Sequence, residues 1–279
     1  MTGDIGVTDP LLALIAHGVR VYDMGRPMTI GMPQSQDHPP FRMVIPRRHG
    51  DLIRADGSSG ANDLIITGSH VGTHIDALAH ISDDGRLHGG VDAQASCIGG
   101  GYAHHGAETI PPMVRRAVLL DVAATLGIDH CPAAYEVTVD DLSAALARTG
   151  VRPSPGDVVL VRTGWGRLYD DTETYVGEVH GAPGPGEAGA RWLAGLEPLA
   201  VGGDTVAFER IPAHRGYGLP GHRVLIVDHG IYIIEVLDLE QLAADGVVEF
   251  TFVLSPLKLV GATGSPVRPL GLVMEEGRG

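Results

Sequence analysis

The sequence predicts a mixed α/β fold in a single domain that spans residues 1–279. Short apolar segments typical of strands alternate with segments of helical periodicity, and this alternation favours strands and helices packed in layers. The hydrophobic content of 44% in 279 residues is ample for one large core. The sequence shows no internal repeat and no linker-like stretch that would divide the chain.

Several segments have the composition of strands, because each is a short apolar or β-branched run bounded by glycine or polar residues. In chain order they are 19–23, 63–67, 117–122, 158–162, 200–205, the run that ends at residue 235, and 249–254. The segment 31–41 is rich in proline and polar residues and is predicted to be a loop, as is the glycine-rich stretch 81–101.

Helix signals lie between these strands. Thr138 and Asp141 form a capping-box-like start for a helix that Gly150 ends. Segment 187–196 has apolar residues at helical spacing and predicts a second helix. Shorter helices are predicted at 11–17 and 238–245.

One stretch concentrates three histidines and a carboxylate, namely His70, His74, Asp76 and His80. Imidazole is the commonest metal ligand among side chains, and imidazoles with a carboxylate suit a borderline divalent cation such as Zn²⁺ or Mn²⁺. Gly72 and the β-branched neighbours of the histidines disfavour one continuous helix. We therefore predict a strand before the motif, a tight turn at Gly72, and a short helix from His74 that carries Asp76 and His80 on one face.

The positions within the motif predict different roles. His70, His74 and Asp76 form the tight cluster that would hold the metal. His80 lies within reach of this cluster but outside it, which suits a general acid or base. The first part of the predicted site is thus the region 63–90.

This stretch also resembles a known signature. The chain has the pattern His70-x-Gly72-Thr73-His74-x-Asp76-x-x-x-His80. The pattern resembles that of the cyclase-like metal-dependent hydrolases, which include bacterial kynurenine formamidase and isatin hydrolase. Leu78 stands where the family usually has proline, which suggests a subgroup other than the typical formamidases.

The resemblance extends from about residue 21 to residue 272 and carries expectations beyond the motif. It implies the swivelling β/β/α fold of that family, assembled as a homodimer or homotetramer. It also implies one or two divalent ions per chain, Mn²⁺ or Zn²⁺, and a C-terminal segment of glycines and small residues that passes close to the site.

A second informative stretch, 219–235, ends in a strongly apolar, β-branched run at Glu235. A buried carboxylate is costly unless it is paired, metal-bound or protonated, so Glu235 is a candidate for both metal binding and catalysis. In the resembled formamidases, a histidine before a similar strand and a glutamate at its end complete a two-metal site. The matching positions here are His222 and Glu235, although the spacing is one residue longer than usual and His229 is a rival of His222.

Composition excludes several classes of partner. The formal net charge of −14 disfavours nucleic acid and anionic membranes. The two cysteines form no disulfide framework and no C-x-x-C pair, which is typical of a reduced compartment. No signal-peptide pattern and no apolar run of about 20 residues occurs. We therefore expect a cytoplasmic protein that acts on a small-molecule substrate.

The absence of several motifs limits the catalytic mechanisms that the sequence supports. No G-x-S-x-G elbow occurs and neither cysteine lies beside the histidine-rich turn, so covalent catalysis has no support. No phosphate-binding or dinucleotide-binding glycine motif occurs either. Of the catalytic mechanisms considered, activation of water by a bound metal ion is the one that the sequence supports. We predict hydrolysis of a small cyclic amide or formamide, with the isatin type first and His80, by resemblance, protonating the leaving nitrogen.

Three other functions are also compatible with the sequence. They are an N-formylkynurenine formamidase, a lactone hydrolase or cyclase, and a non-enzymatic protein that binds a small molecule through its metal. The presence of His80 and Glu235 favours an enzyme, because a binding site needs no group for proton transfer. Trp165, Phe41 and Tyr102 are in or beside predicted loops, and we expect Trp165 and Phe41 to contact a flat substrate ring.

Overall fold

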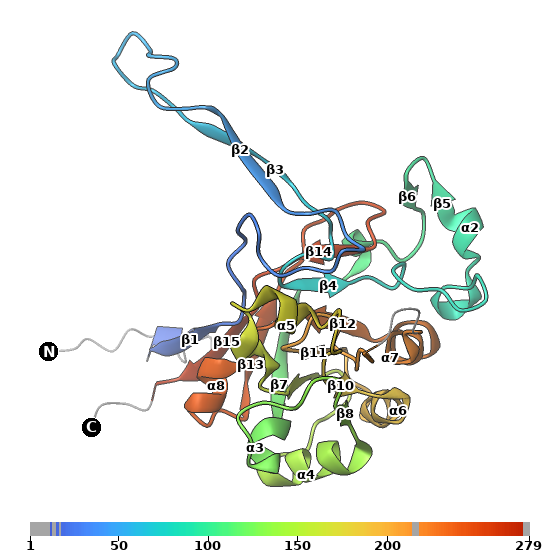
Figure 1. Cartoon of the computed structure of the whole chain (residues 1–279). Coiled ribbons are helices and arrows are strands. Elements are labelled where there is room, and N and C mark those ends of the chain that lie inside the picture. The colour runs from blue at the N-terminus through green and yellow to red at the C-terminus, as the bar shows by residue number, and fades with distance from the viewer. Residues whose placement is uncertain (1–11, 13–14, 17, 214–217, 276–279) are drawn as a thin grey trace, which may run out of the picture.

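A nine-stranded sheet forms the centre of the molecule, which the computed structural model describes at residues 12, 15–16, 18–213 and 218–275 (Figure 1). In spatial order its strands are β1 (Val19–Asp23), β15 (Leu270–Met274), β13 (Glu249–Leu254), β7 (Met113–Asp121), β9 (Val158–Arg162), β11 (Ala200–Gly203), β12 (Tyr232–Glu235), β4 (His74–Asp76) and β14 (Gly264–Pro266). The central strands β7, β9, β11 and β12 run parallel, and the flanking strands are antiparallel to their neighbours. This mixed sheet confirms the predicted α/β class.

Helices connect the parallel strands. They are α3 (Val122–Leu126) and α4 (Val139–Thr149) after β7, α6 (Glu187–Ala194) after β9, and α7 (Pro220–His222) with the π-helical turn η4 (Arg223–Asp228) after β11. In Figure 1, α3 and α4 lie below the sheet, and α6 and α7 lie to its right. All five residues of β9 are buried, as expected of a parallel strand that is covered on both faces. No helix in the part of the chain that the structure describes is both long and apolar enough to cross a bilayer.

The remaining elements are short. They are η1 (His88–Gly90), α2 (Ala93–Ser96), β5 (Cys97–Ile98), β6 (Gly101–Tyr102), η2 (Ala107–Thr109), β8 (Glu136–Val137), η3 (Trp165–Leu168), α5 (Thr172–Val176), β10 (Gly184–Pro185) and α8 (Glu240–Ala244). The stretch 81–101, predicted to be a loop throughout, therefore contains short ordered elements.

Local sequence signals set several boundaries as predicted. Thr138 and Asp141 form a complete capping box at the start of α4, and Gly150 ends this helix in the left-handed conformation at φ 67°. The predicted helix at 187–196 is confirmed as α6. The predicted helix at 11–17 lies mostly outside the described residues.

The helix that was predicted to begin at His74 is wrong, because residues His74–Asp76 form strand β4. Two antiparallel neighbours, β12 and β14, pair with this segment and hold it extended. Successive side chains of a strand point to opposite faces. Ile75 is therefore buried in the main core, while His74 and Asp76 project together on the other face.

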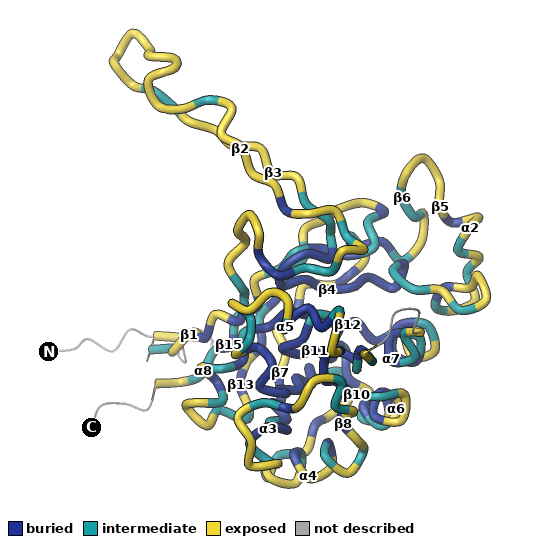
Figure 2. Tube along the Cα trace, viewed as in Figure 1, coloured by how far each residue is buried: buried dark blue, intermediate teal, exposed yellow. Residues whose placement is uncertain are grey.

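One hairpin leaves the body of the molecule. Its strands, β2 (Arg42–Arg47) and β3 (Asn62–Ile66), pair antiparallel, and we call residues 42–66 the arm. Figures 1 and 2 show the arm projecting far from the central sheet with almost its whole length exposed. The strand predicted at 63–67 is confirmed as β3, but it belongs to the arm and not to the central sheet.

Candidate metal centre

The centre of the candidate site lies where β4 meets β12. Glu235, the last residue of β12, is paired directly with His74 across the two strands. The Nε2 atom of His74 lies 3.2 Å from Oε2 of Glu235 and 3.6 Å from Oδ1 of Asp76. All three side chains are buried. Strand pairing thus joins the two sequence regions that were predicted to form the site.

His222 reaches the same point from α7. Its Nε2 atom lies 3.2 Å from Oε1 of Glu235 and 3.5 Å from Oδ2 of Asp76. Glu209 holds this ring, because its Oε1 atom lies 2.6 Å from Nδ1 of His222 and accepts a hydrogen bond from the backbone N–H of His222 at 2.7 Å. A carboxylate beside Nδ1 favours the tautomer that carries its proton on Nδ1, and this leaves the lone pair of Nε2 available to the site. Second-sphere carboxylates act in this way on metal-binding histidines.

His70 lies beside Asp76 from the turn that precedes β4. Its Nδ1 atom lies 2.7 Å from Oδ1 of Asp76, and its Nε2 atom lies 2.9 Å from Oγ1 of Thr263. Gly264 allows this close approach, because a Cβ atom at that position would lie 2.6 Å from Cε1 of His70. The C-terminal segment therefore passes beside the site, as the resemblance implied, and it helps to fix the His70 ring.

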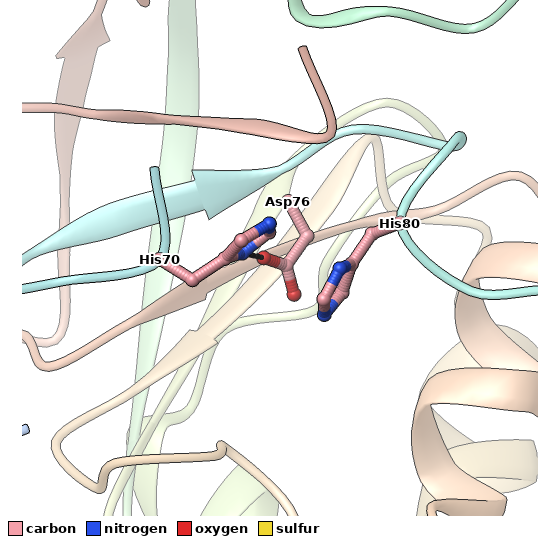
Figure 3. Close-up of side chains that lie close together, drawn as sticks. All are labelled: His70, Asp76 and His80. Carbon is pink, nitrogen blue, oxygen red and sulfur yellow. Dashed lines mark hydrogen bonds and ion pairs between the residues drawn. The ribbon is translucent and has the colours of Figure 1, made fainter. Parts of the chain in front are cut away.

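His80 completes the cluster just after β4. Its ring is stacked on that of His70, with centroids 3.9 Å apart, and Figure 3 shows the Asp76 carboxylate beside both rings. Among the described residues, two groups have ligand atoms within 4.8 Å of one another: His70 with Asp76 and His80, and His74 with Asp76 and Glu235. Asp76 belongs to both groups, so its carboxylate could serve one ion or bridge two.

The buried atoms of this cluster fit a divalent cation. His74 Nε2, Asp76 Oδ2 and Glu235 Oε1 are buried and make no hydrogen bond. Buried polar atoms are nearly always hydrogen-bonded. Several atoms that converge on one point with only ion-pair contacts of 3.2–3.5 Å therefore indicate a site for an ion. Imidazole nitrogens combined with carboxylate oxygens are a suitable donor set for Zn²⁺ or Mn²⁺.

The charged groups of the cluster shift the pKa values of one another. Burial lowers the pKa of His74, but Glu235 and Asp76 together raise it above its ordinary value. His222 behaves in the same way, and Asp76 and Glu235 among its neighbours hold its pKa well above the usual range. Burial raises the pKa of Asp76, yet the neighbouring histidines hold it well below its usual range. A cation must displace protons from His74 and His222, so acid pH opposes metal binding.

A cavity of about 610 Å³ gives access to these residues. On the metal-binding side it is lined by His70, His74, His80, His222 and Glu235. We group the other lining residues by type and call them the polar wall (Ser35, Gln36, Asp37, His38 and Glu178) and the aliphatic wall (Val176, Val206, Ala207, Ile211, Pro212 and Leu219). This size and mixed lining are typical of a site for a small molecule.

The structure places the predicted substrate-binding aromatics elsewhere, which corrects that part of the sequence analysis. Trp165 is buried in a separate cluster, and its indole N–H donates a hydrogen bond to the backbone oxygen of Tyr175 at 2.9 Å. Phe41 packs with Met32 and Val71 behind the turn. Tyr102 lies in the small hairpin of β5 and β6. None of the three side chains is among the residues that line the cavity.

Between the two candidate histidines of the second stretch, the structure favours His222. His229 follows η4 and is exposed, whereas His222 is 3% exposed and lines the cavity.

Comparison with known proteins assigns the chain to a family. A sequence profile of the Cyclase family matches residues 22–210. The chain belongs to the cyclase family. An isatin hydrolase from Roseibium aggregatum is 23% identical over 272 residues, which cover 93% of this chain and 94% of the relative.

Solved structures of cyclase-family proteins have the same fold. A novel cyclase superposes with a TM-score of 0.82 at 27% identity, covering 95% of this chain and 93% of its own. Isatin hydrolase A from Ralstonia solanacearum superposes with a TM-score of 0.73 at 24% identity, covering 97% of this chain and 99% of its own. These similarities confirm the resemblance on which the fold was predicted.

Glu209 is a neighbour of the site that was not predicted from the sequence of this cyclase-family chain. Thr263 and His38 were predicted only through their segments, the C-terminal segment that passes close to the site and the loop 31–41. Glu209 lies 13 positions before His222 in a segment without periodic pattern, and only the folded structure brings the two together. His38 stacks on His70 with ring centroids 5.2 Å apart. The sequence around Glu209 has no local pattern that signals this role.

We expect Glu209→Gln to weaken metal binding by about 10- to 100-fold, which is the usual effect of removing an outer-sphere partner of a ligand. The amide keeps the size of the side chain but removes the charge that fixes Nδ1 of His222. Calorimetric titration of the metal-free protein with Zn²⁺ or Mn²⁺ measures the change.

Glu136→Gln is the matched control for this variant. Glu136 is exposed and is bound to Arg210, the neighbour of Glu209, at 3.1 Å, but it makes no contact with His222. Equal metal affinities for both variants and the wild type would show that Glu209 does not support the metal site.

Proposed function

We propose that this member of the cyclase family is a metal-dependent hydrolase that opens a small cyclic amide of the isatin type. The observation that carries the proposal is the convergence of His74, Asp76, His222 and Glu235 on one point beside a cavity, with buried atoms that make no hydrogen bond. His80 lines the same cavity and offers an imidazole for proton transfer.

When bound, a divalent ion polarises a substrate carbonyl and lowers the pKa of water. The residues of the chain supply the rest. Burial lowers the pKa of His80 to about 3, so its imidazole is neutral at pH 7. Such an imidazole is a weak base, and it would accept a proton from the attacking water only if a bound ion made that water more acidic. The same imidazole can then deliver the proton to the leaving nitrogen as the amide C–N bond breaks, giving an amine and a carboxylic acid, which releases its remaining proton to solvent at pH 7 and becomes a carboxylate.

Glu235 has a positioning part in this proposal. One of its oxygens lies 3.2 Å from Nε2 of His74, and the other lies 3.2 Å from Nε2 of His222. A single carboxylate thus spans both histidines and keeps their nitrogens directed at the same point. Its charge also offsets that of a bound cation in a buried environment.

The cavity and the relatives support an isatin-type substrate. The isatin hydrolase from Roseibium aggregatum is similar over nearly the full length of this chain. Among the described lining residues, no phenylalanine, tyrosine or tryptophan is available to stack on a ring. A flat substrate would therefore lie against the aliphatic wall, with its carbonyls turned toward the histidines.

The test is a spectroscopic assay of the purified protein loaded separately with Mn²⁺ and Zn²⁺. We expect loss of the visible absorbance of isatin as its five-membered ring opens to isatinate, and no loss after the metal is removed by a chelator.

Other outcomes would replace the substrate or the function. Inertness toward isatin with deformylation of N-formylkynurenine would move the activity to acyclic formamides. Turnover of a lactone alone would remove the nitrogen leaving group from the mechanism. Metal-dependent binding of isatin without turnover of any of these compounds would indicate a binding protein.

A further inference from the structure

The chain turns where β12 ends, directly after Glu235. Val236, the next residue, is held in the left-handed region at φ 58°. Of the six non-glycine residues with positive φ in the described chain, it is the only β-branched one. In this conformation the Cβ atom comes close to the following carbonyl oxygen, so such a residue persists only where its surroundings fix it. Because residues in this state cluster at functional sites, the turn beside a candidate metal ligand indicates a role in that site.

Three contacts fix Val236 in this conformation. Its N–H donates a hydrogen bond to the backbone oxygen of Thr205 at 3.0 Å. Its carbonyl oxygen accepts a hydrogen bond from the hydroxyl of Thr73 at 2.7 Å. Its side chain is buried in the apolar cluster that contains Trp165. The bond from Thr73 connects the turn to the histidine motif, because Thr73 directly precedes His74.

The hydroxyl of Thr73 is not needed to hold its own segment. The backbone oxygen of Thr73 already accepts a hydrogen bond at 2.9 Å from the N–H of Val267, which follows strand β14. The hydroxyl instead joins two other segments, because it accepts from the N–H of Arg26 at 2.8 Å and donates to Val236. Thr73 is 3% exposed, so removal of the hydroxyl would leave two backbone groups unpaired in the interior.

The same turn determines where the carboxylate of Glu235 points. On one side Glu235 pairs with His74 of β4, but on the other side the pairing of β12 with β11 stops at Ile234. On that side, the hydrogen bonds of Val236 take over from strand pairing. The two oxygens of Glu235 lie 3.2 Å from Nε2 of His74 and 3.2 Å from Nε2 of His222. A rotation of the backbone at this point would therefore move the carboxylate away from one of the two histidines.

We propose that Thr73 is a positioning residue of the metal centre. Its hydroxyl fixes the left-handed turn at Val236, and this turn directs the Glu235 carboxylate at His74 and His222 together. The two hydrogen bonds of the hydroxyl go to backbone groups outside the candidate ligands, so Thr73 acts through Glu235. The inference rests on the proposed function, because it requires a divalent ion at these residues, but it does not depend on the substrate.

The test is calorimetric titration of the metal-free protein with Mn²⁺ or Zn²⁺, for the wild type, Thr73→Val and Thr73→Ser. Valine keeps the shape of threonine but removes the hydroxyl, so we expect metal binding to be about 10- to 100-fold weaker, the usual effect of removing an outer-sphere partner. Serine keeps the hydroxyl and should bind metal like the wild type. Circular dichroism at the titration temperature shows whether each variant is folded. If valine is not tolerated, Thr73→Ala removes the same hydroxyl without placing a methyl group against its partners, and should weaken binding in the same way.

Thr125→Val is the matched control. The hydroxyl of Thr125 also donates to a backbone oxygen at 2.7 Å, that of Asp121, but Thr125 is on α3 and does not line the cavity. Its loss should lower the unfolding temperature and leave the metal affinity unchanged. This comparison separates the general cost of a lost hydrogen bond from the positioning of Glu235.

Several results would overturn the inference. A folded Thr73→Val protein that binds metal like the wild type would show that the hydroxyl contributes to stability alone. Equally weak binding by Thr73→Ser and Thr73→Val would show that the methyl group, and not the hydroxyl, is required. A wild type that binds neither ion would overturn the proposed function as well. Inertness toward isatin, with the expected order of metal affinities, would remove the proposed substrate and leave the role of Thr73 supported.

Discussion

Asp76→Asn is expected to weaken metal binding by more than about 100-fold, a larger effect than the 10- to 100-fold typical of outer-sphere changes. Asp76 is the residue shared by the two groups of candidate ligands, and its Oδ2 atom is buried without a hydrogen-bond partner. Asparagine keeps the shape but loses the negative charge that compensates a cation. Metal content after gel filtration, measured by mass spectrometry, together with hydrolytic activity, reports the effect.

Asp37→Asn is the matched control for this change. Asp37 lines the same cavity but belongs to neither ligand group. We expect this variant to keep its metal. An Asp76→Asn protein that is folded and retains a full complement of metal would rule out the proposed centre.

Strands and helices were predicted correctly where the local sequence pattern favours the same structure as the contacts in the folded protein. The run at 158–162 is apolar at almost every position and became the buried strand β9. The residues from Thr138 to Gly150 specify both ends of α4 by capping alone. Such signals depend on near neighbours in sequence, so they survive into the fold.

The errors lie where distant segments decided the outcome. Asp76 and His80 are four positions apart, which predicted a common helix face, yet the pairing of His74 with Glu235 and of Asp76 with Gly264 holds this segment in a strand. Trp165 directly follows β9, as expected, but it opens the short helix η3, and its ring is buried in a separate cluster where it donates a hydrogen bond to the backbone oxygen of Tyr175. The local sequence around Asp76 or Trp165 does not reveal which distant segment each residue will contact.

The site was predicted more completely than the fold around it, because its ligands are rare residue types in a dense pattern. His70, His74, Asp76 and His80 are consecutive parts of one motif, and the structure brings them together with His222 and Glu235. The elements that support these ligands, such as Glu209, have no comparable local pattern. The arm presents a related case, since its apolar run predicted a strand but gave no sign that both faces would be exposed.

His80→Ala is expected to lower turnover by about 10²- to 10⁴-fold, the usual contribution of a positioned acid or base. The ion held by His74, Asp76 and Glu235 should remain, because these residues form a group of ligand atoms without His80. Metal content and initial rates, measured on the same preparation, separate the two effects. Added imidazole should restore part of the rate, because a free base can enter the space that the side chain leaves.

His229→Ala is the matched control, since His229 is an exposed histidine of the second stretch that does not line the cavity. It should behave as the wild type. His80 also forms the other ligand group with His70 and Asp76, and this gives the experiment a second reading. If His80→Ala loses one metal ion per chain and imidazole restores metal and rate together, His80 is a ligand of a second ion. Proton transfer would then have to come from a different group on the cavity wall, and His38, which stacks on His70, is the nearest imidazole on the polar wall.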